Sequence, residues 1–122
     1  TTAPPKNTVF DPFHTKQADT IRRIHDAKTS DLKKRYTIEG LSRQYLINTA
    51  ALKSVFKSVY GMPVASYMKQ YRIMKAAELL RNTDKSVSAV ASEVGYESQS
   101  KFSAAFKDIM KILPTDYRRQ YT

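Results

Sequence analysis

Two stretches of the chain, residues 48–60 and 98–110, combine apolar side chains at helical spacing with small or basic side chains. In these stretches Lys53 and Gln99 carry hydrogen-bond donors that suit base edges. A lysine can donate to guanine O6 and N7, and a glutamine can pair with adenine N6 and N7. Lys57 and Lys107 lie nearer the C-terminal halves, where a backbone phosphate is the expected target. These residue types predict contact with nucleic acid.

At 100° per residue, each stretch forms a helix with one apolar face. The residues predicted to face inward are Leu52, Val55, Phe56 and Val59 in the first helix and Phe102, Ala105, Phe106 and Ile109 in the second. Those predicted to face outward are Ala50, Lys53, Ser54 and Lys57, followed by Ser100, Ser103, Ala104, Lys107 and Lys111. Asp108 is the only acid in the two helices. The outer faces therefore suit a polyanion whose major groove is about 12 Å wide.

The two helices belong to an internal repeat. Phe56 matches Phe106 and Lys57 matches Lys107 at an offset of fifty residues, while upstream the offset is forty-nine, as for Leu41 and Val90. Each unit is a short helix, a tight turn and a longer helix, which is the helix-turn-helix arrangement. Two copies in a basic chain favour DNA binding much more strongly than one copy would.

Helical spacing continues over the rest of the chain and predicts an all-α fold of about seven helices. Their expected ranges are 15–34, 38–45, 49–60, 64–81, 87–94, 99–110 and 114–121. Capping residues are expected at Thr15, Thr37, Asn48, Ser86 and Ser98, and glycine stops at Gly61 and Gly95. The long fourth helix carries a wide apolar arc, which consists of Val64, Tyr67, Met68, Tyr71, Met74, Ala77 and Leu80. We divide the chain into an arm at 1–14, a first helix-turn-helix subdomain at 15–62, a linker helix at 63–81 and a second subdomain at 82–122.

The amino-acid composition of the chain favours some classes of function and argues against others. The 122 residues include 21 Lys and Arg against 11 Asp and Glu, a net charge of +10 that points to a polyanionic partner. The chain has no cysteine, its two histidines lack a partner at metal-ligand spacing, and no Gly-rich phosphate loop occurs. We therefore expect no enzyme activity, no cofactor and no metal. No signal peptide or membrane span is visible, so we expect a cytoplasmic protein without a membrane partner.

Residues 37–118 resemble the DNA-binding domain of the AraC/XylS family of bacterial transcription regulators. The strongest match is "SVSAVASEVGYESQSKFSAAFKDIMKILPTDYRR" at 86–119, with its Gly95-Tyr96, Phe106-Lys107 and Tyr117-Arg118 pairs. The segment "GMPVASYMKQYRIMKAAELL" at 61–80 is similar to the linker helix of the family, including Arg72.

The resemblance implies that two recognition helices enter successive major grooves of double-stranded DNA. Carried over position by position, the contacts are Thr49, Ala50, Lys53 and Ser54 in the first helix and Gln99, Ser100, Lys101, Ser103 and Ala104 in the second. It also implies a contact with RNA polymerase if the protein is an activator. Because the chain lacks an initiating Met, we expect a fragment whose sensor and dimerisation domain precedes residue 1.

Several positions depart from the family pattern. Leu46 stands where the first turn usually has Gly, and a left-handed backbone costs roughly 1 kcal/mol more for Leu, so we expect that turn to differ. Lys111 replaces a second Gly, and Leu113 replaces a capping Ser. Ala50 and Ser54 are small, so base contacts of the first helix are expected to be sparse. A nonspecific architectural protein that binds DNA or RNA remains the alternative hypothesis.

Overall fold

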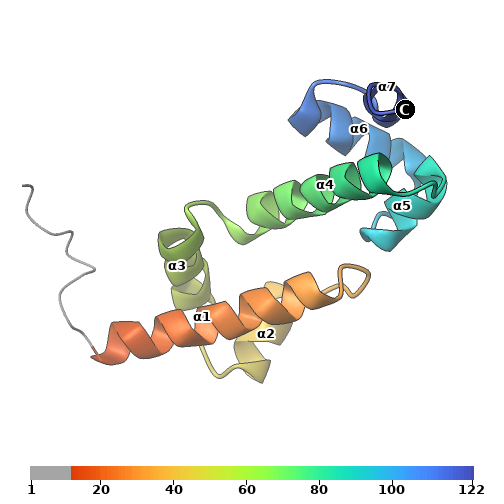
Figure 1. The fold of residues 1–122 in the computed structure, drawn as a ribbon. Helices are drawn as coiled ribbons and strands as arrows, with labels where there is room; N and C mark the ends of the chain where they lie inside the picture. The colour runs from red at the N-terminus through yellow and green to blue at the C-terminus, as the bar shows by residue number, and fades with distance from the viewer. Residues whose placement is uncertain (1–11) are drawn as a thin grey trace, which may run out of the picture. The chain divides into compact units, whose positions relative to one another are not determined.

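The computed structural model describes the backbone of residues 12–122 and the side chains of residues 15–122. Over this range the chain forms seven α-helices and no strand (Figure 1), which confirms the predicted all-α class. The helices are α1 (Pro12–Ser30), α2 (Ile38–Gln44), α3 (Thr49–Tyr60), α4 (Val64–Asn82), α5 (Val87–Glu93), α6 (Gln99–Met110) and α7 (Pro114–Arg119). Most of the arm predicted at 1–14 lies outside the described residues, while residues 12–14 belong to α1.

The first helix differs most from its prediction. Thr15 is not its cap, because α1 begins at Pro12, where a proline suits the first helical position. The helix ends at Ser30 rather than near residue 34. Asp31 explains this early end: its carboxylate accepts from the Lys33 N–H (3.2 Å) and its carbonyl from the Lys34 N–H (3.3 Å), which closes a turn.

The described chain divides into two compact units, which we describe separately. The first unit contains α1 as far as Ala27 and residues Tyr36–Val64; the second contains Lys28–Arg35 and Ala65–Thr122. The subdomains drawn from the sequence placed residues 28–35 in the first unit. In the structure the Leu32 carbonyl of this segment instead accepts a hydrogen bond from Arg72 in α4. That contact joins residues forty positions apart, which no local pattern in the sequence indicates.

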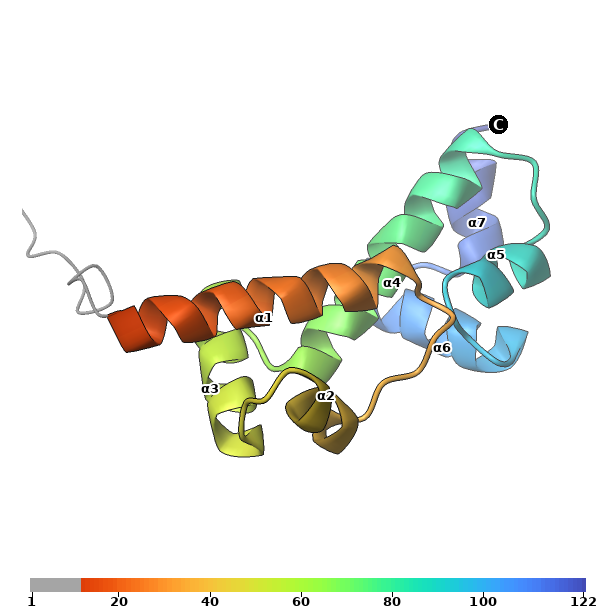
Figure 2. The same cartoon turned by 90° about the horizontal axis from the view of Figure 1, so that it is seen from below.

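In the first unit, α2 and α3 pack against each other (Figure 2). Leu41 of α2 and the predicted inward residues Leu52, Val55 and Phe56 of α3 are buried, and Val59 is half-buried. Ile21 and Ile24 of α1 are also fully buried in this unit. The predicted apolar face of α3 is therefore confirmed.

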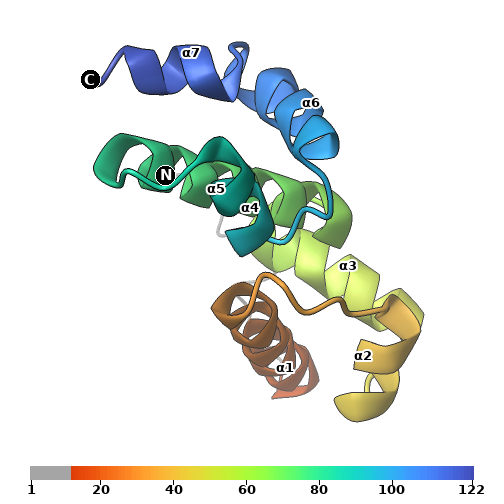
Figure 3. The same cartoon turned by 90° about the vertical axis from the view of Figure 1, so that its right-hand side faces the viewer.

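In the second unit, α6 lies against both α5 and α7 (Figure 3). Phe102, Ala105 and Phe106 are buried as predicted, and Phe106 packs edge-on against Tyr117 with 5.4 Å between ring centroids. Within α4, Val64, Met68, Ala77 and Leu80 of the predicted arc are buried, and Tyr67 and Tyr71 are half-buried. Met74 is 53% exposed, because the buried face continues through Arg72, Ile73 and Ala76 instead.

The two turns share one hydrogen-bond pattern. The Ile47 N–H donates to the Ser42 carbonyl (3.1 Å), and the Tyr96 N–H donates to the Ala91 carbonyl (2.9 Å) at the corresponding positions. The turn residues before them both have positive φ, 54° at Leu46 and 96° at Gly95. The expectation that the first turn would differ is therefore wrong: Leu46 adopts the left-handed conformation despite its side chain.

The same conformation ends each recognition helix. Gly61, with φ 82°, follows α3 and donates from its N–H to the Lys57 carbonyl (2.8 Å). Lys111, with φ 64°, follows α6 and donates to the Lys107 carbonyl (2.9 Å). Each copy thus has glycine at one of its two left-handed positions and a larger residue at the other. In the first copy the glycine is Gly61, directly after the recognition helix, and in the second copy it is Gly95, in the turn before the recognition helix.

We predict that Leu46→Gly stabilises the domain by about 1 kcal/mol. A left-handed backbone costs a residue with Cβ roughly 1–2 kcal/mol, of which the greater freedom of unfolded glycine cancels part. The Leu46 side chain is 93% exposed, so its removal loses little packing. Urea unfolding of the variant and the parent measures the difference.

Leu46→Ala is the matched control, because it removes most of the exposed side chain but keeps the Cβ atom. Its stability is expected to stay close to that of the parent. Equal stability of the Gly and Ala variants would show that the backbone conformation at residue 46 carries no such cost.

Candidate nucleic-acid interface

The recognition helices α3 and α6 are built alike. Both contain 12 residues, and both begin at a neutral cap: the Asn48 side chain accepts from the Ala51 N–H (2.7 Å) and the Ser98 hydroxyl from the Lys101 N–H (3.1 Å). Neither helix has an acid in its first turn. The first turn of each helix is therefore free of carboxylates, which favours a phosphate there, and the acid nearest to the start of α6 is Glu97, directly before the cap.

The predicted contact residues lie on the faces opposite the buried stripes. In α3 the exposed ones are Ala50, Lys53, Ser54 and Lys57, with Thr49 half-buried at the start of the helix. In α6 the exposed ones are Gln99, Ser100, Lys101, Ala104 and Lys107, with Ser103 half-buried. Each helix thus presents its own set of small and basic side chains at the surface, and their contacts with DNA stay a prediction.

Asp108, the one acid in the two recognition helices, forms an ion pair within the second unit. Its carboxylate accepts a hydrogen bond from the Lys69 ammonium of α4 at 2.5 Å. That hydrogen bond, with the charge of Lys69, holds the pKa of Asp108 below its usual value. The one acid of the two helices is therefore ionised and paired with a cation, which reduces its repulsion of a nearby phosphate.

Two arginines at the second turn, Arg35 and Arg72, were not among the site residues predicted from the sequence. Arg72 is 7% exposed, and its guanidinium donates to the carbonyls of Leu32 and Val94, the latter at 2.8 Å. The Arg35 guanidinium donates to the Gly95 carbonyl. The family resemblance included Arg72 only as a matching position in the linker helix and did not indicate that it is buried. The spacing of charged residues does not distinguish Arg35 from other exposed basic residues.

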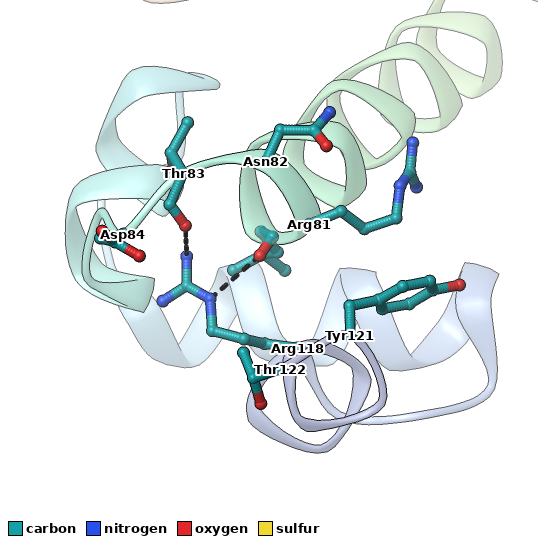
Figure 4. Close-up of a pocket in the computed structure, with 8 residues that line it drawn as sticks. Arg81, Asn82, Thr83, Asp84, Arg118, Tyr121 and Thr122 are labelled. Atoms are coloured by element: carbon teal, nitrogen blue, oxygen red, sulfur yellow. Dashed lines mark hydrogen bonds between the residues drawn. The ribbon is translucent and has the colours of Figure 1, made fainter.

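A pocket of about 320 Å³ lies at the C-terminal end of α4, in the second unit. Figure 4 shows Arg118 reaching the end of that helix, where its guanidinium donates to the carbonyls of Leu80 (3.1 Å) and Thr83 (3.3 Å). Arg81 donates to the Tyr117 hydroxyl at 2.5 Å. Both arginines thus hold α4 to α7, and Arg118 satisfies carbonyls that the helix end leaves without an intrahelical partner.

Two further observations concern other classes of site. Among the side chains of residues 15–122, no group of three or more His, Asp or Glu lies close enough together to bind a metal ion. Within the described range, none of the helices combines the length and the apolar character that a membrane crossing needs.

Comparisons with known proteins agree with this architecture. A family model described as a helix-turn-helix domain matches residues 41–120. The transcriptional activator RhaR of Mannheimia succiniciproducens is 28% identical over 101 residues, which cover 83% of this chain and 37% of that protein. A putative AraC-like transcription regulator of Streptomyces lividans is 32% identical over 71% of this chain and 29% of its own length. This chain therefore spans about a third of the length of these relatives.

A solved structure has the same fold. The DNA-binding domain of the global transcriptional factor AdpA, determined in complex with a target DNA, superposes with a TM-score of 0.78 over 84% of this chain and 92% of that one, at 22% identity. The family model covers well over half of the chain, and its match extends from within α2 past the end of α7, so that it includes both turns and both recognition helices. The chain belongs to the AraC/XylS family of helix-turn-helix proteins.

Proposed function

We propose that this chain is the sequence-specific DNA-binding domain of a bacterial transcription regulator, with α3 and α6 as its recognition helices. The observation that carries the proposal is the repeat itself. Two capped helices of equal length each bury an apolar face and expose a face of small and basic residues. AdpA, which shares the fold, is bound to a target DNA in its structure.

The proposed contacts divide by chemistry. Lys53 and Gln99 are the candidates for hydrogen bonds to base edges, and Lys57 and Lys107 for backbone phosphates. The remaining candidates, which supply small polar, apolar or basic contacts, are Thr49, Ala50, Ser54, Ser100, Lys101 and Ser103. The family resemblance adds the expectation that the two helices enter successive major grooves, whose centres are about 34 Å apart. The proposed role is binding, without a catalytic step.

The relatives also support proposals about the full protein, of which this chain would be one domain. The aligned segments cover only 37% and 29% of these two relatives, which supports a sensor and dimerisation domain outside this chain. RhaR is a transcriptional activator, and if this protein is an activator as well, a contact with RNA polymerase is part of the proposal. We further propose that the protein works in the cytoplasm, where its DNA target would lie.

Selection of duplexes from a random pool by the purified chain, at a stated salt concentration, tests the proposal. The expected result is an enriched site with two half-motifs whose centres lie about 10 base pairs apart. Enrichment without a motif, or stronger retention of RNA, would instead support the nonspecific architectural hypothesis.

We predict a steep salt dependence for duplex binding. The logarithm of the affinity is expected to fall with the logarithm of salt concentration by about 0.9 for each phosphate contacted. Lys57→Ala and Lys107→Ala are each expected to reduce this slope by about 1. Lys75→Ala serves as the control, because Lys75 lies on α4 and pairs with Glu78 at 3.6 Å. An affinity that does not change with salt would contradict the electrostatic part of the proposal.

Lys53→Ala and Gln99→Ala are predicted to relax base preference at different positions of the selected site, about one helical turn apart. Loss of a base contact is expected to cost about 1–3 kcal/mol against the preferred base and little against others. Affinities for duplexes with single base changes measure this. If either variant weakened binding equally on every duplex, that side chain would contact phosphate rather than a base.

A further inference from the structure

Residues Lys28–Arg35 lie outside the matched helix-turn-helix span yet pack onto the turn of the second copy. Arg35 donates to the Gly95 carbonyl, and the Leu32 carbonyl accepts from Arg72, which also donates to the Val94 carbonyl at 2.8 Å. Consecutive carbonyls of the turn are therefore held by two guanidinium groups. The guanidinium of Arg35 belongs to residues 28–35, and the guanidinium of Arg72 contacts this segment at the Leu32 carbonyl.

The approach at Gly95 is close enough to require glycine. A Cβ atom built on Gly95 would collide with the Leu32 carbonyl oxygen and with Arg72 Nη1, and would lie 3.1 Å from the Leu32 carbonyl carbon. At the corresponding turn of the first copy, Leu46 has the same left-handed backbone, but its side chain is 93% exposed. The first turn is thus open, and the second is covered by residues 28–35.

The covered turn leads directly into α6. Tyr96, the next residue, packs against Phe102 with ring centroids 5.6 Å apart, and Ser98 caps the helix two residues later. Because the Val94 and Gly95 carbonyls are fixed, the direction in which the chain enters α6 is fixed as well. The exposed residues at the start of α6, Gln99 among them, take their position from this turn.

The contact also carries an electrostatic cost. Lys28 is 8% exposed and lies with Arg72 and Arg35 in one cluster of positive charge. Burial, followed by repulsion from these arginines, lowers the pKa of Lys28, and burial with repulsion from Arg35 lowers the pKa of Arg72. Hydrogen bonds to carbonyls offset this repulsion, so loss of one of them should loosen the segment from the turn.

We propose that residues Lys28–Arg35 form a clamp on the second turn, in which Arg35 and Arg72 are positioning residues for base recognition by α6. In this role the clamp acts on base recognition through the turn that precedes α6. This inference rests on the proposed DNA-binding function for its effect on specificity, while the clamp itself is a property of the free protein.

Arg35→Met tests the clamp, since it removes the guanidinium donors at an exposed position and keeps a similar apolar stem. Lys33→Met is the matched control, because it removes the same charge from an exposed residue of the same segment. Arg35→Lys restores the charge with a single donor group and is expected to restore part of the effect.

The first measurement is amide hydrogen exchange in the free chain. Arg35→Met is expected to speed exchange about tenfold at Gly95, Tyr96 and the first turn of α6, with no change in α3. Lys33→Met is expected to leave these rates unchanged. Equal rates in Arg35→Met and Lys33→Met would overturn the clamp, whatever the chain binds.

The second measurement compares a duplex selected by the parent chain with a scrambled duplex of equal length. Arg35→Met is expected to lower the ratio of the two affinities about tenfold, whereas Lys33→Met weakens both affinities equally and keeps the ratio. An unchanged ratio in Arg35→Met, beside faster exchange, would overturn the positioning role. If the parent chain itself showed no preference, the proposed function would fail, and the exchange experiment would still decide the clamp.

Discussion

Each helix-turn-helix copy depends on one residue that adopts a left-handed backbone between its two helices. Without that residue the chain cannot reverse tightly enough for the apolar stripe of the second helix to reach the first. Leu46 and Gly95 satisfy this requirement in different ways, one with an exposed side chain and the other without any side chain. The burial of Phe56 and Phe106, and with it the exposure of the opposite faces, follows from this turn.

The distribution of charge obeys a second constraint. A helix that approaches DNA must be capped without adding negative charge, and the caps of α3 and α6 are Asn48 and Ser98 rather than aspartate. The exception, Asp108, is held by Lys69 of α4. Neither recognition helix therefore carries an acid that is not paired with a cation.

Local signals allowed much of the fold to be predicted. The starts of α3 and α6 were predicted correctly because capping side chains mark them, and the end of α3 because Gly61 follows it. The predicted end of α6 is also correct, although Lys111 stands where a glycine is usual. The end of α1 was predicted wrongly, because the helical pattern of the sequence continues past Ser30 whereas Asp31 forms a turn. Arg72 was missed as a buried residue, since a charged side chain enters the interior only where carbonyls from distant segments meet it. The contact residues were predicted partly from periodicity and partly from the family resemblance, neither of which determines which base or phosphate each residue meets.

The two copies both have neutral caps, an equivalent turn hydrogen bond and recognition helices of equal length, yet two differences bear on base recognition. One difference lies at the start of each recognition helix, where α3 has Thr49 and α6 has the longer Gln99 at the corresponding position. The other is the cover on the turn, which is present only in the second unit. A long polar side chain distinguishes bases only if its backbone is held in place, because a shift of the helix start moves its amide out of hydrogen-bonding range. The longer side chain and the fixed turn therefore occur together in the second copy, and base recognition is expected to depend mainly on α6.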